Sequence, residues 1–320
     1  MPYLSKFLPL DVNKDFAPIG IGVFMPMMLG AASGVFATKL AELIAHNKTN
    51  PGKPAYGTPG SGTAHHNSFE TLRERRYDKL AIVAVFMDSL IVGKQHILAV
   101  LGLDATGHKH LLSLVVSSSE NARVAKDLLE QLRDQGLDLG EPRLWVMDGS
   151  KALVSAISCL CGQAAKAQRC QIHKIRNVTE RLPKDMRAQV AWRMKAAFGL
   201  QPVNGMGRLK ALAQELKAQH PDAAPSVLEG LEQMFTAATL GVQGPLARSL
   251  SSTNIIESPN SVVRRRSQRV KNYPNADMAL RWTVIGFLKS ERGMRRTKGF
   301  AQLPELIRAL RPQQEQKLEA

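Results

Sequence analysis

The chain has 320 residues, of which 44% are hydrophobic, so it can build the core of one large domain or two ordinary ones. Its 43 Lys and Arg residues outnumber its 27 Asp and Glu residues, and the net charge of +16 favours a polyanionic partner, nucleic acid before membrane lipid. This composition excludes a disordered protein, and three cysteines are too few for a disulfide framework, so we expect a cytoplasmic protein.

The first 66 residues differ in character from the rest. Residues 16–38 are uncharged and long enough to span a bilayer as a helix, and a Gly, Pro, Ser and His stretch at 50–68 has the composition of a linker. Pro18, Pro26 and four glycines in the uncharged segment argue against a spanning helix. We therefore interpret residues 1–66 as an atypical N-terminal segment and linker, and we do not expect a membrane protein.

Strand patterns begin at Leu80. Three runs rich in β-branched residues, LAIVAVFMD, IVGKQHILAVLGL and HKHLLSLVV, are separated by short turns and predict three antiparallel strands. An amphipathic helix over about 119–135, a short strand RLWVMD, a helix after Gly149 and a strand near QRCQI follow. This order predicts an α/β fold.

The pattern turns wholly helical from about residue 173 to 239, where four prolines punctuate successive segments. Two last helices, at roughly 255–271 and 276–290, contain most of a basic cluster. We expect these parts: the segment 1–66, a core 67–180, a helical insertion 181–245, the C-terminal helices of the core 246–300 and a tail 301–320.

Two aspartates follow apolar runs that a fold must bury. Asp88 ends the first predicted strand and Asp148 ends the fourth. The first and fourth strands are commonly neighbours in this order, so both carboxylates would project from one edge of the sheet, and their repulsion would need a cation. Hard oxygen ligands favour Mg²⁺ or Mn²⁺, which indicates phosphoryl transfer. Taken singly, either Asp could instead be an ordinary strand-end or helix-capping residue.

Four blocks of sequence resemble the Mutator-type insertion-sequence transposases over about residues 69–300: RRYDKLAIVAVFMDSLIVG, LWVMDGSKALVSAI, AQRCQIHKIRNVTERLPK and STNIIESPNSVVRRRSQRVKNYP. The resemblance implies a ribonuclease-H-like mixed sheet flanked by helices and interrupted by an all-helical insertion. It also implies a catalytic triad of Asp88, Asp148 and Glu257, separated by 60 and 109 residues, that binds Mg²⁺ or Mn²⁺ and cleaves and joins DNA. Such a protein would be associated with the nucleoid and would act as a homo-oligomer on element ends and target DNA.

Cys170 and His173 match a Cys-x-x-His feature of the same family. Zinc binding by Cys159, Cys161, Cys170 and His173 is the alternative, but Cys159 and Cys161 lie two apart on a predicted helix and point to different faces. We expect Cys170 and His173 to be structural or to face the substrate.

Basic residues gather after the glutamate. The candidate DNA contacts are Arg264, Arg265, Arg266, Arg269 and Lys271, which we expect to bind phosphates without reading sequence. A solvated helix face is the plainer interpretation of such a run.

The chain departs from the family pattern in three ways. Ser89 stands where relatives usually have Gly, and Pro259 follows the glutamate by two residues, so the helix must either contain a proline, at about 3 kcal/mol, or begin at Ser258. Residues 1–66 do not resemble the region with which relatives recognise element ends. The alternative function is therefore a truncated, inactive remnant that only binds DNA; a membrane-tethered interaction protein is a third hypothesis.

Overall fold

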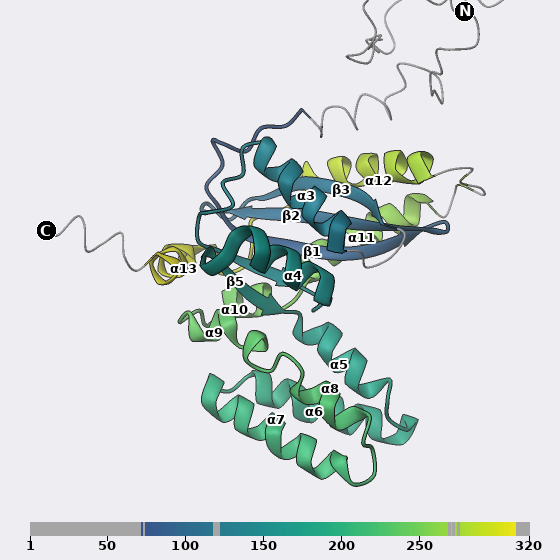
Figure 1. Ribbon diagram of the computed structural model, residues 1–320, viewed down its shortest axis with the longest axis vertical. Coiled ribbons are helices and arrows are strands. Elements are labelled where there is room, and N and C mark those ends of the chain that lie inside the picture. The colour runs from purple at the N-terminus through teal and green to yellow at the C-terminus, as the bar shows by residue number, and fades with distance from the viewer. Residues whose placement is uncertain are drawn as a thin grey trace, which may run out of the picture. The chain divides into compact units, whose positions relative to one another are not determined.

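The computed structural model describes residues 72, 74–117, 122–267, 270, 273 and 276–311, with the backbone alone for Ser117 and Arg266. The chain divides into two units, Met1–Asn67 and Ser68–Ala320, and all described residues belong to the second. The predicted N-terminal segment and linker, with its uncharged stretch 16–38, therefore lies outside the described residues. Figure 1 shows the described part as a sheet flanked by helices, with a further group of helices beyond one sheet edge.

Five strands form one mixed sheet in the order β3-β2-β1-β4-β5. They are β1 (Ile82–Val92), β2 (Gln95–Asp104), β3 (Lys109–Ser117), β4 (Arg143–Met147) and β5 (Ala165–Arg169). β1 pairs antiparallel with β2 and parallel with β4, β2 pairs antiparallel with β3, and β4 pairs parallel with β5. This is the ribonuclease-H-like α/β fold expected from the sequence.

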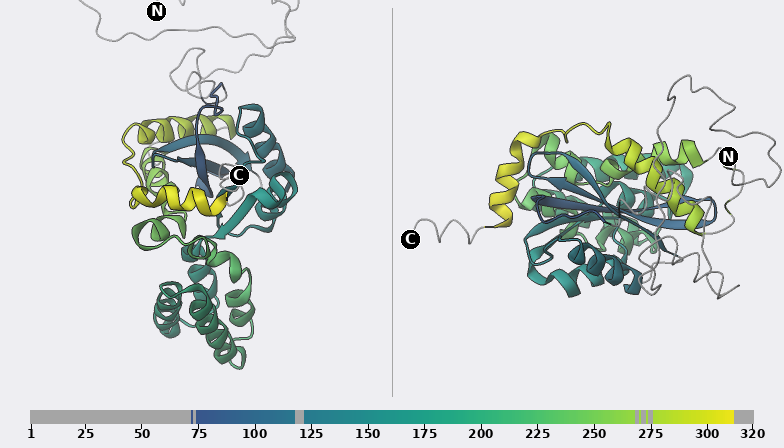
Figure 2. Two further views of the ribbon diagram at one scale, coloured as in Figure 1. Left: turned by 90° about the vertical axis from the view of Figure 1, so that its left-hand side faces the viewer. Right: turned by 90° about the horizontal axis from the view of Figure 1, so that it is seen from above.

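Helices cover both faces of the sheet (Figure 2). On one face, α3 (Ala122–Asp134) and α4 (Lys151–Cys161) pack on a core that includes Val85 and Met87 of β1. On the other, α10 (Gly244–Leu250), α11 (Asn254–Ser267), α12 (Ala276–Glu291) and α13 (Leu303–Leu310) pack on a second core. Ala84, Phe86, Leu90 and Val92 of β1 belong to this second core. Because side chains alternate along a strand, Asp88 points to the α11 side.

The first strand continues past Asp88, contrary to the prediction that it ends there. The exposed and buried residues alternate over Ser89–Val92, and these four residues pair with β2 up to the turn at Gly93. The sequence IV at 91–92 therefore belongs to β1 and not to the next strand. What ends near Asp88 is only the parallel pairing with β4, whose last matched pair is Met87 and Met147.

The predicted helical insertion is present beyond β5 and has a core of its own (Figure 1). Its helices are α5 (Gln171–Thr179), α6 (Lys184–Phe198), α7 (Pro202–Lys217), α8 (Ala223–Leu228) and α9 (Thr236–Thr239), with a 3-10 turn η2 at Glu232–Met234. Met194, Leu209 and Phe235 are among its buried residues. Two further 3-10 turns, η1 (Gly162–Ala164) and η3 (Phe300–Gln302), precede β5 and α13.

The outer edge of β5 is covered by the segment that returns from the insertion. The Thr236 hydroxyl donates to the Ala167 carbonyl at 2.6 Å, and the buried Gln168 side chain donates to the Met234 carbonyl and accepts from the Ala237 N–H. The first bond occupies a backbone carbonyl that an open strand edge would leave unpaired, and the two Gln168 bonds attach the returning segment to β5. Within the part of the chain that is described, no helix is long and apolar enough to cross a membrane.

Candidate active site

Asp88 in β1 and Asp148 directly after β4 lie beside one another at the end of the parallel pairing. Each follows the last matched pair of β1 and β4, so the parallel register brings the two residues level with each other. Asp88 is only 6% exposed, whereas Asp148 is half-buried in the loop that leads to α4. Ser89 lies within β1 in ordinary extended backbone, so its replacement of the expected Gly causes no strain there.

The loop after Asp148 is shaped by one glycine and one backbone hydrogen bond. Gly149 has a φ of +95°, a value that favours glycine, and the Ser150 N–H donates to Asp148 Oδ1 at 2.9 Å. A Cβ added to Gly149 would fall 3.0 Å from the Arg169 guanidinium carbon. The Asp-Gly-Ser sequence therefore turns the chain from β4 into α4 while leaving one Asp148 oxygen outside this bond.

Glu257 comes from α11, in its first turn. Ile256 and Val263 of this helix are fully buried in the core on the α11 side, and this packing leaves Glu257 half-buried. The helix begins at Asn254 and contains Pro259, so of the two outcomes that Pro259 allowed, the proline inside the helix is the one observed. The missing N–H costs one bond of the helical ladder, within a total of about 3 kcal/mol for an interior proline.

The charges of Asp148 and Glu257 both act on Asp88. The pKa of Asp88 is raised to about 6, above all by burial, and the neighbouring Asp148 and Glu257 contribute to this rise. His173 and the Ser89 N–H oppose this rise in pKa. The described residues nevertheless contain no group of three His, Cys, Asp or Glu side chains close enough to hold a metal ion by themselves. The triad residues are thus electrostatic neighbours, and their convergence on one ion remains a prediction.

Asn260 is a site residue that the sequence reasoning missed. It is completely buried one turn after Glu257, and its Nδ2 donates to Asp88 Oδ2 at 3.4 Å. Its Oδ1 is buried without a hydrogen-bond partner among the described residues. The available signal was its spacing of three residues from Glu257, which places both on one face of a helix.

Cys170 and His173 join β5 and α5 to the start of α11. Cys170 is fully buried, and its Sγ accepts from the Thr253 N–H at 3.4 Å and from the Thr253 hydroxyl at 3.6 Å. The hydrogen bond with Cys170 raises the pKa of His173 to about 9 despite partial burial, with Asp88 and Asp148 adding to the effect. Burial alone would raise the pKa of the Cys170 thiol, but His173 and Thr253 together hold it below its ordinary value.

His173 lies 3.5 Å from the Thr253 hydroxyl and close enough to Asp88 and Asp148 for their charges to act on it, and whether its role is structural or toward the substrate stays a prediction. Cys159 and Cys161 sit on α4, one exposed and one buried, so they face different sides as their spacing predicts. Thr253 was not singled out from the sequence, although it directly precedes α11 in the block that contains Glu257.

The basic residues after Glu257 are described only in part. Arg264 and Arg265 are exposed on α11. Of Arg266 only the backbone is described, and Arg269 and Lys271 lie outside the described residues. Two of the five candidate DNA contacts are therefore exposed on the helix that contains Glu257, and the position of the other three side chains is still a prediction.

Two protein families match the chain, over regions that overlap by a few residues. Residues 68–292 match the sequence model of the family described as "Transposase, Mutator family". Residues 1–81 match that of the family described as "Tripartite tricarboxylate transporter family receptor". The two matches overlap only at 68–81, so the change in composition near residue 66 coincides with a change in the family that is matched.

Curated relatives are similar to the chain at moderate identity. The transposase for insertion sequence element ISRM5 of Rhizobium meliloti is 29% identical over 65% of this chain and 50% of that protein. The transposase for IS905 of Lactococcus lactis is 28% identical over 95% of this chain and 80% of that protein. The transposase for IS256 in transposon Tn4001 of Staphylococcus aureus is 28% identical over 66% of this chain and 54% of that protein. The chain thus spans about half the length of the first and third of these relatives.

Proposed function

The chain belongs to the Mutator family of transposases, and on this basis we propose that it catalyses metal-dependent cleavage of DNA and joining of an insertion-sequence end to target DNA. The observation that carries the proposal is the environment of Asp88. A buried carboxyl whose pKa is about 6, beside Asp148 and Glu257, is in a place where a cation would relieve both burial and repulsion.

The residues present fit Mg²⁺ or Mn²⁺. All three carboxylates supply hard oxygen donors, and Asn260 adds a buried oxygen without a partner among the described residues. Two such ions, when bound, activate the attacking oxygen and stabilise the leaving oxygen of an in-line displacement at phosphorus. Sulfur donors would favour zinc instead. The fully buried thiol near the site, that of Cys170, already accepts hydrogen bonds from the N–H and the hydroxyl of Thr253.

Each residue has a proposed role. Asp88, the central and most buried carboxylate, would bridge both ions, and Asp148 and Glu257 would each bind one. His173 would place a positive charge beside Asp88 and Asp148, where it opposes their repulsion. Asn260 would orient Asp88 through its Nδ2. These residues would hold a water for the first cut and then the 3′-hydroxyl for joining.

DNA would lie along α11. Arg264 and Arg265 are exposed seven and eight residues after Glu257, so phosphates bound there would lead toward the carboxylates. Arg266, Arg269 and Lys271 would extend this contact. Because joining needs two element ends, the working protein would be at least a dimer, and residues 1–66 would form a separate segment outside the catalytic core.

A second candidate function is DNA binding without catalysis. Pro259 in the second turn of α11 favours it, because a break in the helical ladder two residues after Glu257 can displace that carboxylate. The match of residues 1–81 to a second family, described as a transporter receptor, also favours it, because the Mutator-family match begins only at residue 68.

Strand transfer with purified protein, a pre-cut DNA end and Mn²⁺ distinguishes the two functions. Joined product that disappears in the Asp148→Asn variant would support catalysis. DNA binding without any product, under conditions in which the protein is folded and binds Mn²⁺, would favour the non-catalytic alternative.

A further inference from the structure

Arg169, the last residue of β5, lies between two parts of the protein that are distant in sequence. Its side chain is 9% exposed. On one side it contacts the loop that follows Asp148, and on the other it contacts the turn between α8 and η2 of the helical insertion. The loop and the turn are about 80 residues apart along the chain.

On the core side, Arg169 holds the residue next to a proposed metal ligand. Its Nη2 donates to the Gly149 carbonyl at 3.1 Å, and its backbone pairs with Met147, the residue before Asp148. The side chain lies against Gly149, where an added Cβ would approach its guanidinium carbon to 3.0 Å. The position of the Asp148 loop therefore depends on where this guanidinium lies.

On the insertion side, three groups fix the same guanidinium. Nε donates to Gln233 Oε1 at 3.1 Å, and Nη1 donates to the Glu229 carbonyl at 3.3 Å and lies 3.5 Å from Glu229 Oε1. A Cβ on Gly230 would fall 2.5 Å from Arg169 Nε, so the turn approaches this closely only with glycine. The buried Lys174 also donates to Glu229 Oε2, at 3.3 Å.

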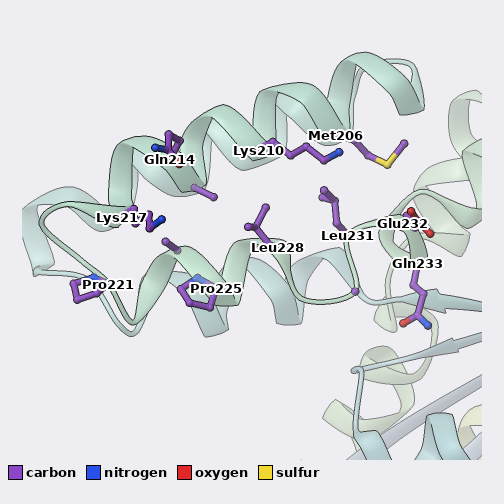
Figure 3. Close-up of a pocket in the computed structure, with 13 residues that line it drawn as sticks. Met206, Lys210, Gln214, Lys217, Pro221, Pro225, Leu228, Leu231, Glu232 and Gln233 are labelled. Carbon is purple, nitrogen blue, oxygen red and sulfur yellow. The ribbon is translucent and has the colours of Figure 1, made fainter.

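The same turn forms one end of a groove in the insertion (Figure 3). The groove, of about 910 Å³, lies between α7 and α8, and Gly230, Glu232 and Gln233 are among its lining residues. A shift of this turn would move Gln233 and Glu229 relative to Arg169, and through Arg169 relative to Gly149.

We propose that Arg169 is a positioning residue that fixes the Asp148 loop by joining it to the helical insertion. The proposal rests on the proposed function, in which Asp148 binds metal. Residues that hold a metal ligand in place without touching the ion typically change metal affinity by about 10- to 100-fold when they are replaced. The insertion would then act on the Asp148 loop through the Arg169 guanidinium.

Arg143 provides a matched control for a purely structural role. It is also a buried arginine at a strand end, 2% exposed, but it begins β4 at the opposite end from Asp148. Its guanidinium donates to the carbonyls of Ile82 and Asp138 and to Glu141. Lysine keeps the charge at either position but loses the planar set of donors, so Arg169→Lys and Arg143→Lys should both lower thermal stability.

Mn²⁺ affinity separates the two variants. Electron paramagnetic resonance of free Mn²⁺, measured on the full chain, should show about tenfold weaker binding for Arg169→Lys and wild-type binding for Arg143→Lys. Strand transfer by Arg169→Lys should need correspondingly more Mn²⁺ and recover when Mn²⁺ is saturating. Equal Mn²⁺ affinity in both variants would overturn the positioning role.

A second pair tests the insertion side without changing Arg169. Gly230→Ala and Gly241→Ala both place a side chain where φ is positive, at +65° and +78°, but only the first meets Arg169, since nothing described lies within 4 Å of the second. Gly230→Ala alone should weaken Mn²⁺ binding. If Gly241→Ala weakened it equally, backbone strain would explain the loss and the proposal would fail.

Asp148→Asn distinguishes this proposal from the proposed function. Loss of Mn²⁺ affinity in Asp148→Asn, with unchanged affinity in Arg169→Lys and Gly230→Ala, would refute only the role of Arg169. Wild-type Mn²⁺ affinity in Asp148→Asn would refute Asp148 as a ligand, and the positioning role with it.

Discussion

The two ends of the parallel pair β1 and β4 use buried charge in opposite ways. At the amino end, Arg143 is surrounded by acceptors from the core, two backbone carbonyls and Glu141. At the carboxyl end, Asp88 is buried beside two further carboxylates and its pKa is raised to about 6. The Arg143 guanidinium therefore has hydrogen-bond acceptors for its charge, whereas the Asp88 carboxylate lies beside like charges and would be stabilised by a cation.

The comparison shows why the two ends should respond differently to mutation. A satisfied buried charge contributes to stability, and removing it leaves partners unpaired. An unsatisfied one lowers stability and is retained where function needs it. Substitutions at the amino end should therefore reduce stability with little effect on catalysis, and those at the carboxyl end should do the reverse.

The largest expected effect is on catalysis at the carboxyl end. Asp88→Asn, Asp148→Asn or Glu257→Gln should each reduce strand transfer by about a thousandfold or more, because each removes a proposed metal ligand. DNA binding should remain close to wild type in a gel-shift assay. Asp138→Asn, which changes an exposed carboxylate near the amino end of β4, is the control and should leave joining unchanged. Equal loss of joining and binding in a triad variant would indicate collapse of the fold.

The next effect is on stability at the amino end. Arg143→Ala should lower the free energy of unfolding by about 3 kcal/mol, because it leaves the buried Ile82 carbonyl and the part-buried Asp138 carbonyl without their donor. Urea denaturation measures this loss. At a temperature where the variant is folded, its rate of strand transfer should stay within about threefold of the wild-type rate. This is less than the tenfold change in rate that about 1.4 kcal/mol of activation free energy would cause. A larger loss of joining would mean that the two ends are not independent.

A smaller effect is a gain of stability on removing the Asp88 charge. The pKa of Asp88 is raised from 3.8 to about 6, so the folded protein favours the neutral carboxyl. The stability due to this neutral form is fully present below pH 3.8 and is lost as the pH rises through about 6. Without metal at pH 8, Asp88→Asn should therefore unfold at a higher urea concentration than wild type, with a free energy of unfolding larger by roughly 2 kcal/mol. The difference should be smaller at pH 5.

Mn²⁺ should reverse that order at pH 8, because it stabilises a protein only through a site that binds it in the folded state. Wild type should gain thermal stability from Mn²⁺ and Asp88→Asn should not. A variant no more stable than wild type at pH 8 without metal would contradict the raised pKa.

The sequence predicted the parts of this site that repeat a simple pattern. Buried runs followed by Asp88 and Asp148 located one carboxylate in β1 and one directly after the neighbouring β4, and the resemblance to a family supplied Glu257. The sequence did not predict that β1 continues to Val92, because the apolar run before Asp88 obscured the alternation that follows it. Nor did it predict Asn260 or Arg169, because their partners lie 172 and 20 or more residues away and only packing brings them together.

The smallest expected effect concerns the exposed arginines of α11. They lie outside the two strand ends, and we expect them to bind DNA and not metal. Each phosphate contact should contribute about −0.9 to the slope of log K against log salt, so the five predicted contacts give about −4 to −5. Arg265→Gln should flatten this slope by about one and weaken all DNA sequences alike, because phosphate contacts do not read bases. Arg133→Gln, which removes an exposed charge from α3, should leave the slope unchanged. Mn²⁺ affinity should be that of wild type in both variants, since neither residue touches a carboxylate of the triad.

If Arg265→Gln changed the preference for one DNA sequence while the slope stayed constant, α11 would be reading bases. Its proposed role as a contact to the DNA phosphate backbone beside the active site would then be wrong.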